Sequence, residues 1–473
     1  MLKNYISSVL RQNFEYEPTT SQKKAFFDLS EFIGSSIQDE IFLLKGYAGT
    51  GKTTLINTLV KSLSFFKIKT FLLAPTGRAA KVVSSYTHQK AYTVHKKIYR
   101  QKAGISGFGN FDLNKNLHTD TFFIVDEASM IANGSSEMSA FGSGRLLDDL
   151  MEFVYSGTNC KLMLVGDSAQ LPPVGLAESP ALDVENLKTY GFRVYHLELT
   201  DVVRQTEASG ILKNATYLRN FLLNFESTNP YPKLKTNGLA DVKNINGTEL
   251  IEEISTAYGK YGMDQTIILS RSNKRTIRFN NGIRNTILYR EEELSNGDFL
   301  MVVKNNYHWV ADFEETDFIA NGDICEITRI KRFEELYGYR FADVDIRFLD
   351  YENLEVSAKI ILDSLTVEAA ALSIENTKKL YEEIEKEYLE IPQKRLRYLK
   401  IKENPYFNAM QVKFAYAVTC HKAQGGQWKA VFIDQGFIND EMINKEYIRW
   451  LYTAITRATE VVYLVNFNEK FFE

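Results

Sequence analysis

One eight-residue segment, GYAGTGKT at 46–53, limits the fold of this chain more than any other part of its sequence. It follows an apolar run at 41–44 and precedes a helical pattern at 55–63. In that setting the glycines let backbone N–H groups surround a phosphate, and the start of the helix adds a positive partial charge. Lys52 is expected to reach the β- and γ-phosphates, and the Thr53 hydroxyl to bind Mg²⁺. The predicted nucleotide contacts are Gly46, Ala48, Gly49, Thr50, Gly51, Lys52, Thr53 and Thr54.

Short apolar runs recur along the chain, and several of them end in glycine, proline or aspartate before a helical pattern begins. Apolar strands that alternate with helices are typical of parallel sheets covered by helices on both faces. The first runs predict one α/β domain, and the later runs predict a second α/β domain built from two separated pieces. The runs lie at 41–44, 70–73, 121–125 and 162–165, and then at 266–269, 415–419, 430–433 and 461–465.

The region between those two pieces has a different pattern. From about 294 to 362 the apolar runs are short and separated by turn signals such as Gly297-Asp298, which predicts a small antiparallel barrel or sheet. Residues 364–402 are helical in composition, with acidic residues before Pro392 and basic residues after it. That charge pattern fits a solvated helical hairpin, and it also fits an arm that touches DNA or a protein partner. Both interpretations stay open.

The segment FFIVDEA at 122–128 ends an apolar run in two adjacent carboxylates. Asp126 is placed to hold Mg²⁺, and Glu127 to orient or deprotonate an attacking water. Gln170, which follows the run at 162–165, is a candidate sensor of the γ-phosphate or of that water. Arg204 and Arg457 are candidates for the fixed cations that balance charge on a transferred phosphoryl group. With Lys52, these residues predict a phosphoryl-transfer site that uses ATP and Mg²⁺.

Composition narrows the class of protein further. The 473 residues are enough for two to four domains of about 100–200 residues. With 56 basic and 60 acidic residues the net charge is −4, which excludes binding of nucleic acid by bulk positive charge but allows a local basic groove. Cys160, Cys325 and Cys420 lie far apart, which predicts reduced thiols rather than disulfides or a zinc site. No apolar run approaches the roughly 18–20 residues that span a membrane, so we expect a cytoplasmic protein.

The order of these segments resembles that of the superfamily 1 DNA helicases, and within them the RecD/Dda-like 5′-to-3′ group of superfamily 1B. Gln22 stands where the family has the glutamine that reads the adenine, and Arg204 where it has an arginine finger. The matching segments are 19–22 (Q motif), 46–53 (motif I), 74–81 (Ia), 92–95 (Ib), 126–129 (II), 166–173 (III), 268–273 (the strand opening the second core domain), 418–425 (V) and 452–458 (VI).

The resemblance implies an α/β fold with two RecA-like domains and ATP bound between them. The first domain would occupy 19–200 after an N-terminal helix at 1–18, and the second would combine 201–293 with 409–473. The family also implies a β-hairpin pin, here at about 96–119 with Phe108 and Phe111 as candidates for its tip. An SH3-like barrel would occupy 294–365. The charged arm at 366–408 would resemble an extra arm of some members and is a candidate contact for a protein partner.

The family binds single-stranded DNA and duplex junctions, and the resemblance implies which residues do so here. Trp428 is more typical of the core beneath motif V than of a base-stacking position. Gly77 and Ala423 depart from bulkier or hydroxyl-bearing residues in relatives, which removes two potential contacts. A long N-terminal partner domain is lacking, so we expect a stand-alone helicase rather than an obligate subunit. We also expect a monomer and no contact with a membrane. The implied DNA contacts are Pro75, Thr76, Thr93, His95, Thr419, His421 and Lys422.

The function implied is that of an ATP-dependent 5′-to-3′ DNA helicase, and replication, recombination and repair all fit it. Two alternatives stay open. One is a translocase or protein-displacing ATPase that unwinds duplex weakly, because the segment at 96–119 is not a clear pin. The other is an inactive DNA-binding subunit, against which the full set of Lys52, Glu127, Gln170, Arg204 and Arg457 argues.

Overall fold

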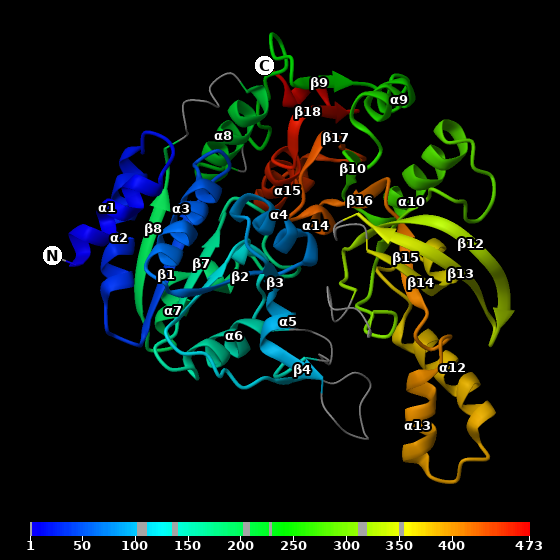
Figure 1. Ribbon diagram of the computed structural model, residues 1–473. Coiled ribbons are helices and arrows are strands. Elements are labelled where there is room, and N and C mark those ends of the chain that lie inside the picture. Colours follow the sequence, from blue (N-terminus) through cyan, green and yellow to red (C-terminus); the bar gives the residue numbers. More distant parts are fainter. Residues whose placement is uncertain are drawn as a thin grey trace.

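The first half of the chain is organised around a six-stranded sheet in which every neighbouring pair is parallel (Figure 1). The computed structural model describes residues 2–101, 111–134, 141–201, 209–226, 229–310, 319–349 and 354–473. Because parallel strands end at the same edge, the loops that follow them gather their side chains there. Across the sheet the strands are β3 (Ala91–Thr93), β2 (Lys69–Ala74), β6 (Thr121–Val125), β7 (Lys161–Gly166), β1 (Glu40–Gly46) and β8 (Arg193–Leu199).

Helices cover both faces of this sheet because its central strands are apolar on both sides. On β1, Phe42 and Leu44 pack against α1 to α3, whereas Ile41 and Leu43 pack with α5 and α6 on the other face. The N-terminal helix belongs to this domain, since Ile6 of α1 is buried in the same core. The helices are α1 (Leu2–Asn13), α2 (Thr20–Gly34), α3 (Lys52–Phe65), α4 (Gly77–Thr87), α5 (Val94–Ile98), α6 (Leu146–Tyr155) and α7 (Val184–Lys188).

A second parallel sheet forms the other core domain, as the separated apolar runs predicted. It combines strands from before and after the barrel, so this domain is assembled from two pieces of chain. Across the sheet the strands are β16 (Ala417–Thr419), β10 (Thr266–Ser270), β17 (Trp428–Asp434), β18 (Ala458–Val465) and β9 (Val242–Ile245). The helices are α8 (Gly210–Leu223), α9 (Leu250–Tyr261), α10 (Asn273–Gly282), α14 (Cys420–Ala423) and α15 (Lys445–Ile455). The predicted α/β fold with two RecA-like domains is confirmed.

A closed five-stranded barrel lies between the two pieces, which confirms the predicted insertion. Its last strand, β15, pairs antiparallel with β11 and parallel with β14, and this pairing closes the barrel. The barrel therefore takes residues 410–414, which lie beyond the expected limit at 365, because closure leaves no unpaired sheet edge. The strands are β11 (Phe299–Val302), β12 (Ile324–Leu336), β13 (Tyr339–Phe348), β14 (Glu355–Ile361) and β15 (Met410–Phe414), with the short α11 (Asp363–Thr366) after β14.

The charged segment forms a helical arm that leaves the barrel after β14 and returns to it at β15 (Figure 1). Its helices are α12 (Ile374–Glu385) and α13 (Lys394–Glu403). Leu380 and Ile384 of α12 and Ile401 of α13 form a small core with Phe341 and Ile361 of the barrel. The arm is thus anchored by apolar packing, and its charged residues cover the remaining faces.

The expected pin begins as a short antiparallel ladder of β4 (Tyr99–Gln101) and β5 (Phe111–Leu113). Phe108 lies outside the described residues. The placement of Phe111 at an exposed tip is wrong, because its side chain is only 8% exposed. It stacks on Phe141 at 4.7 Å and lies 4.7 Å from Tyr307 of the barrel domain, measured between ring centroids. Within the described ranges, no helix has both the length and the apolar character needed to cross a membrane.

Candidate functional site

The loop between β1 and α3 has the geometry of a phosphate cradle. A Cβ atom on Gly46 would lie 2.9 Å from both Lys52 Cγ and Thr50 Oγ1, so the loop has no room for a side chain there. Gly49 and Gly51 have φ values of 76° and 84°, in the left-handed region that favours glycine. No side chain caps the start of α3, so its first N–H groups are available to an anion.

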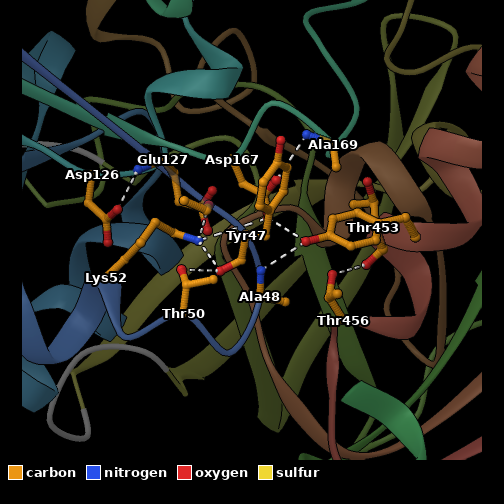
Figure 2. Close-up of polar contacts among 12 residues, drawn as sticks. Tyr47, Ala48, Thr50, Lys52, Asp126, Glu127, Asp167, Ala169, Thr453 and Thr456 are labelled. Atoms are coloured by element: carbon orange, nitrogen blue, oxygen red, sulfur yellow. Dashed lines mark hydrogen bonds and ion pairs between the residues drawn. The ribbon is translucent and has the colours of Figure 1, made fainter. Parts of the chain in front are cut away.

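The Lys52 ammonium group lies over this loop (Figure 2). Its Nζ donates hydrogen bonds to the main-chain oxygens of Gly46 at 2.6 Å and Tyr47 at 3.0 Å. It also lies 3.9 Å from Oδ2 of Asp167, a buried carboxylate at the end of β7. Lys52 is therefore held by its own loop on the side where phosphates would bind.

Asp126 and Glu127 follow β6 at the same edge of the sheet. The N–H of Glu127 donates to Asp126 Oδ1 at 2.9 Å, and Tyr86 Oη donates to Asp126 Oδ2 at 3.0 Å. Burial raises the pKa of both carboxyl groups, while nearby Arg457 lowers the pKa of Glu127. Glu127 has a φ of 53°, an uncommon conformation for a residue other than glycine, and one that clusters at functional sites.

The second core domain closes over the P-loop through α15. Tyr452 Oη accepts a hydrogen bond from the N–H of Ala48 at 2.9 Å and donates to Asp167 Oδ2 at 2.7 Å. Thr453 Oγ1 accepts from the N–H of Leu171 at 2.9 Å, and Gln424 Nε2 donates to the Leu171 oxygen at 2.8 Å. Sequence reasoning assigned no role to Asp167, Tyr452 or Thr453, although all three lie inside the motifs that it quoted.

Two further predicted residues lie in this cleft. Arg457 is 4% exposed, and its guanidinium donates to the main-chain oxygens of Thr453 at 3.1 Å and Gly426 at 3.2 Å. Gln170 is buried, and its Oε1 has no hydrogen-bond partner. A buried amide oxygen without a partner is costly, and a bound ligand or water would relieve that cost. Arg204 lies outside the described residues.

The residues present fit ATP with Mg²⁺. The uncapped start of α3 and the unpaired Gln170 oxygen suit phosphate groups and the water that attacks them. Thr53 is exposed at that helix start, and Asp126 offers carboxylate oxygens, which are the ligands that Mg²⁺ prefers. Gln22, the predicted adenine contact, lies against the P-loop, where its Nε2 donates to the Thr50 oxygen at 3.1 Å and its Oε1 accepts from the N–H of Thr19 at 3.0 Å. In this structure Gln22 supports the P-loop.

A cavity of about 1180 Å³ lies beside the nucleotide site, between the first domain on one side and the barrel, arm and motif V on the other. Thr76 and Thr93 also cap α4 and α5, with Oγ1 accepting from Ala79 N–H at 3.2 Å and Lys96 N–H at 3.1 Å. Thr419 is the one implied DNA contact that does not line the cavity. The implied contacts that do line it are Pro75, Thr76, Thr93, His95, His421 and Lys422.

Burial gives the cavity a distinct chemistry. His95 lies 4.9 Å from the ring of Phe141, and burial lowers the pKa of His95 to about 4, so the imidazole is neutral at pH 7. Burial also lowers the pKa of Lys422 to about 8. Trp428 is 2% exposed and packs 4.0 Å beneath the Arg78 guanidinium, as expected for a core residue.

Two lysines that line this cavity were not among the implied DNA contacts, namely Lys304 after β11 and Lys402 on α13. Burial lowers the pKa of each, and neither forms an ion pair with a carboxylate in the described part of the chain. Cations that line a cavity and form no ion pair there are suited to an anionic ligand such as a phosphate backbone. Lys304 lies in no motif, whereas Lys402 belongs to the basic run after Pro392, for which an arm that touches DNA was one of the two interpretations.

Comparisons with known proteins found similar domains, relatives and solved structures. A model of the AAA domain matches residues 30–220, and one of the UvrD-like helicase C-terminal domain matches 414–465. The ATP-dependent RecD2 DNA helicase of Deinococcus radiodurans is 30% identical over 197 residues, which cover 41% of this chain and 24% of that protein. The RecBCD enzyme subunit RecD of Buchnera aphidicola is 23% identical over 512 residues, which cover 96% of this chain and 73% of that protein. A crystal structure of Pif1 helicase from Bacteroides with ADP-AlF3 and ssDNA aligns with a TM-score of 0.49 and 15% identity, covering 97% of this chain and 95% of that one.

Two RecA-like domains that meet at one P-loop define a P-loop ATPase of the helicase class. The matched domains and the two RecD relatives narrow this class further. These likenesses support the RecD-like DNA helicases of superfamily 1B, the group that the motif order predicted.

Proposed function

We propose that this protein is an ATP-dependent helicase that moves 5′ to 3′ along single-stranded DNA and unwinds duplex ahead of it. One observation carries the proposal: the two core domains share both the P-loop contacts and the adjacent cavity. If ATP binding changes how the two core domains pack against each other, it therefore also moves the walls of the cavity in which a DNA strand would lie. The direction of movement follows the family resemblance.

ATP hydrolysis would be carried out by residues from both sides of the cleft. Lys52 and the N–H groups of the P-loop hold the phosphates, and Glu127 accepts a proton from the attacking water. Gln170 positions that water, while Arg457 and Arg204 stabilise charge on the transferred phosphoryl group. Thr53 and Asp126 would hold Mg²⁺, which neutralises charge on the β- and γ-phosphate oxygens when bound.

The DNA strand would occupy the cavity. Lys422, Lys304 and Lys402 are placed to meet backbone phosphates, and the His95 ring offers an uncharged surface to a base or sugar. Because Lys402 comes from α13, we infer that the arm contributes a wall of the DNA site. Of the two interpretations of the arm given by its charge pattern, we therefore favour an arm that touches DNA over a solvated helical hairpin.

A second candidate function is a translocase that unwinds duplex weakly. The short β4–β5 ladder and the buried position of Phe111 favour it, because one of the two aromatic candidates for a pin tip is already packed. We also infer a monomer that acts in the cytoplasm, where its three buried free cysteines would stay reduced.

The test is unwinding of two partial duplexes, one with a 5′ and one with a 3′ single-stranded tail, with ATP and Mg²⁺. We expect opening of the 5′-tailed substrate alone. Lys52→Ala should abolish DNA-stimulated ATP hydrolysis and unwinding while leaving most binding to single-stranded DNA. Opening of the 3′-tailed substrate alone would overturn the direction. ATP hydrolysis stimulated by single strands without opening of either substrate would support the translocase, and hydrolysis by the Lys52→Ala protein would overturn the site.

A further inference from the structure

A tyrosine outside the motifs contacts the carboxylate assigned to Mg²⁺. Tyr86 lies near the end of α4, and its Oη donates to Asp126 Oδ2 at 3.0 Å. A tyrosine hydroxyl is protonated at neutral pH, so Tyr86 is the donor of this hydrogen bond.

The two oxygens of Asp126 are held from opposite sides. Oδ1 accepts the N–H of Glu127, which is fixed by the local backbone. Oδ2 depends on Tyr86, which comes from a different element. Each carboxylate oxygen has two lone pairs, so both oxygens keep one for a metal ion or its water shell. The orientation of the carboxylate thus depends on where α4 lies.

The position of α4 depends in turn on the cavity and on the second core domain. Thr76 caps the start of α4 and lines the cavity. The motif V loop packs against the first turn so closely that a Cβ on Gly425 would lie 2.6 Å from Ala79 Cβ. Further along, the Arg78 guanidinium lies 4.0 Å from the Trp428 ring, and Lys81 Nζ donates to the Leu349 oxygen of the barrel domain at 2.6 Å.

We propose that Tyr86 is a positioning residue for Asp126, and that α4 links the DNA cavity to the magnesium-binding carboxylate through it. The inference rests on the proposed ATP site. A tyrosine that only filled the core would be replaceable by phenylalanine without effect on metal binding. A hydroxyl that orients a metal-binding carboxylate would not, since losing such an outer partner typically weakens metal affinity about 10- to 100-fold.

The experiment measures binding of a fluorescent ADP analogue to the full chain at increasing Mg²⁺, without turnover. Tyr86→Phe should leave affinity in the absence of Mg²⁺ within about twofold of the wild type. The Mg²⁺ concentration that gives half of the metal-dependent tightening should rise about tenfold. Tyr155→Phe is the matched control, because Tyr155 Oη donates to the Glu40 oxygen at 2.7 Å far from the site.

A double mutant shows whether the effect passes through Asp126. Asp126→Asn should remove most of the metal-dependent tightening, and adding Tyr86→Phe should change nothing more. In the ATPase assay, Tyr86→Phe should also lose several-fold of the stimulation by single-stranded DNA at unchanged DNA affinity. Equal Mg²⁺ requirements in Tyr86→Phe, Tyr155→Phe and wild type would overturn the proposal. A wild type that binds the analogue with Mg²⁺ but never hydrolyses ATP would refute the proposed function and leave this inference standing.

Discussion

At the scale of single residues, burial rather than residue type decides the chemistry of the cavity that we propose binds DNA. Lys422 is a clear case, because its Nζ donates to Asn321 Oδ1 at 2.5 Å and burial lowers its pKa to about 8. An ordinary lysine with a pKa of about 10.4 stays charged across the working range of most assays. Lys422, with a pKa of about 8, instead loses its charge within the pH range in which DNA binding can be measured.

This difference predicts a pH-dependent affinity for single-stranded DNA. Lys422 is protonated below pH 8 and loses its charge above it, so one phosphate contact weakens as the pH rises from 7 to 9. We expect a fall in affinity of about fivefold over that interval, measured by fluorescence anisotropy with a labelled oligonucleotide. Lys422→Arg should flatten the curve, because a guanidinium stays charged throughout. Equal slopes for the two proteins would contradict the assignment.

The motifs identified those site residues that lie together in one short loop, such as Lys52 and Thr53 after β1 and Asp126 and Glu127 after β6. Tyr86, Tyr452 and Lys402 could not be found in this way. Tyr86 lies outside the motifs, and Tyr452 lies in motif VI and Lys402 in the basic run of the arm, but each reaches the site only through packing of a distant element. Sequence patterns reveal local geometry, whereas these contacts are set by tertiary structure.

At the scale of elements, the apolar run at 410–420 shows why the barrel boundary was misplaced. The apolar run at 415–419 predicted a single strand there. The run instead divides into β15, which closes the barrel, and β16, which is an edge strand of the second sheet. Hydrophobicity alone cannot divide such a run, because both strands are buried. The edge strands β8 and β9 were missed for the opposite reason, since both have exposed positions and no continuous apolar pattern.

The arm makes a prediction at this same scale. Lys402 and Lys400 lie on α13, and of these two lysines only Lys402 lines the cavity, whereas Lys400 pairs at 3.1 Å with Glu403 at the cavity wall. Lys402→Glu should lower the affinity for single-stranded DNA about tenfold and reduce the salt dependence by about one phosphate contact. Lys400→Glu carries the same charge change and should have a much smaller effect. Similar losses in both variants would indicate a general electrostatic effect and remove the arm from the DNA site.

At the scale of the whole molecule, the closeness of the two domains depends on a few polar contacts through α15. Tyr452 is central to them, because its hydroxyl bridges the N–H of Ala48 in the P-loop and the carboxylate of Asp167. Both partners are in the first domain, so this one atom joins the domains on the side where ATP would bind. This contact between Tyr452 of motif VI and the P-loop follows from the fold, and no single motif could have predicted it.

Tyr452→Phe should therefore shift the free protein toward an open arrangement of its domains. In the closed form the variant leaves the Ala48 N–H without its partner and removes one of the hydrogen bonds to the Asp167 carboxylate, at a cost of about 1.5–3 kcal/mol for a bond to a charged acceptor. That cost would change the ratio of closed to open molecules about tenfold or more, which single-molecule energy transfer between dyes on the two domains can measure. Tyr447→Phe is the control on the same helix, because Tyr447 Oη accepts from Gln435 Nε2 at 3.3 Å within the second domain. If both variants keep the wild-type distribution, closure is set by apolar packing of α15 and the bridging hydroxyl contributes little to it.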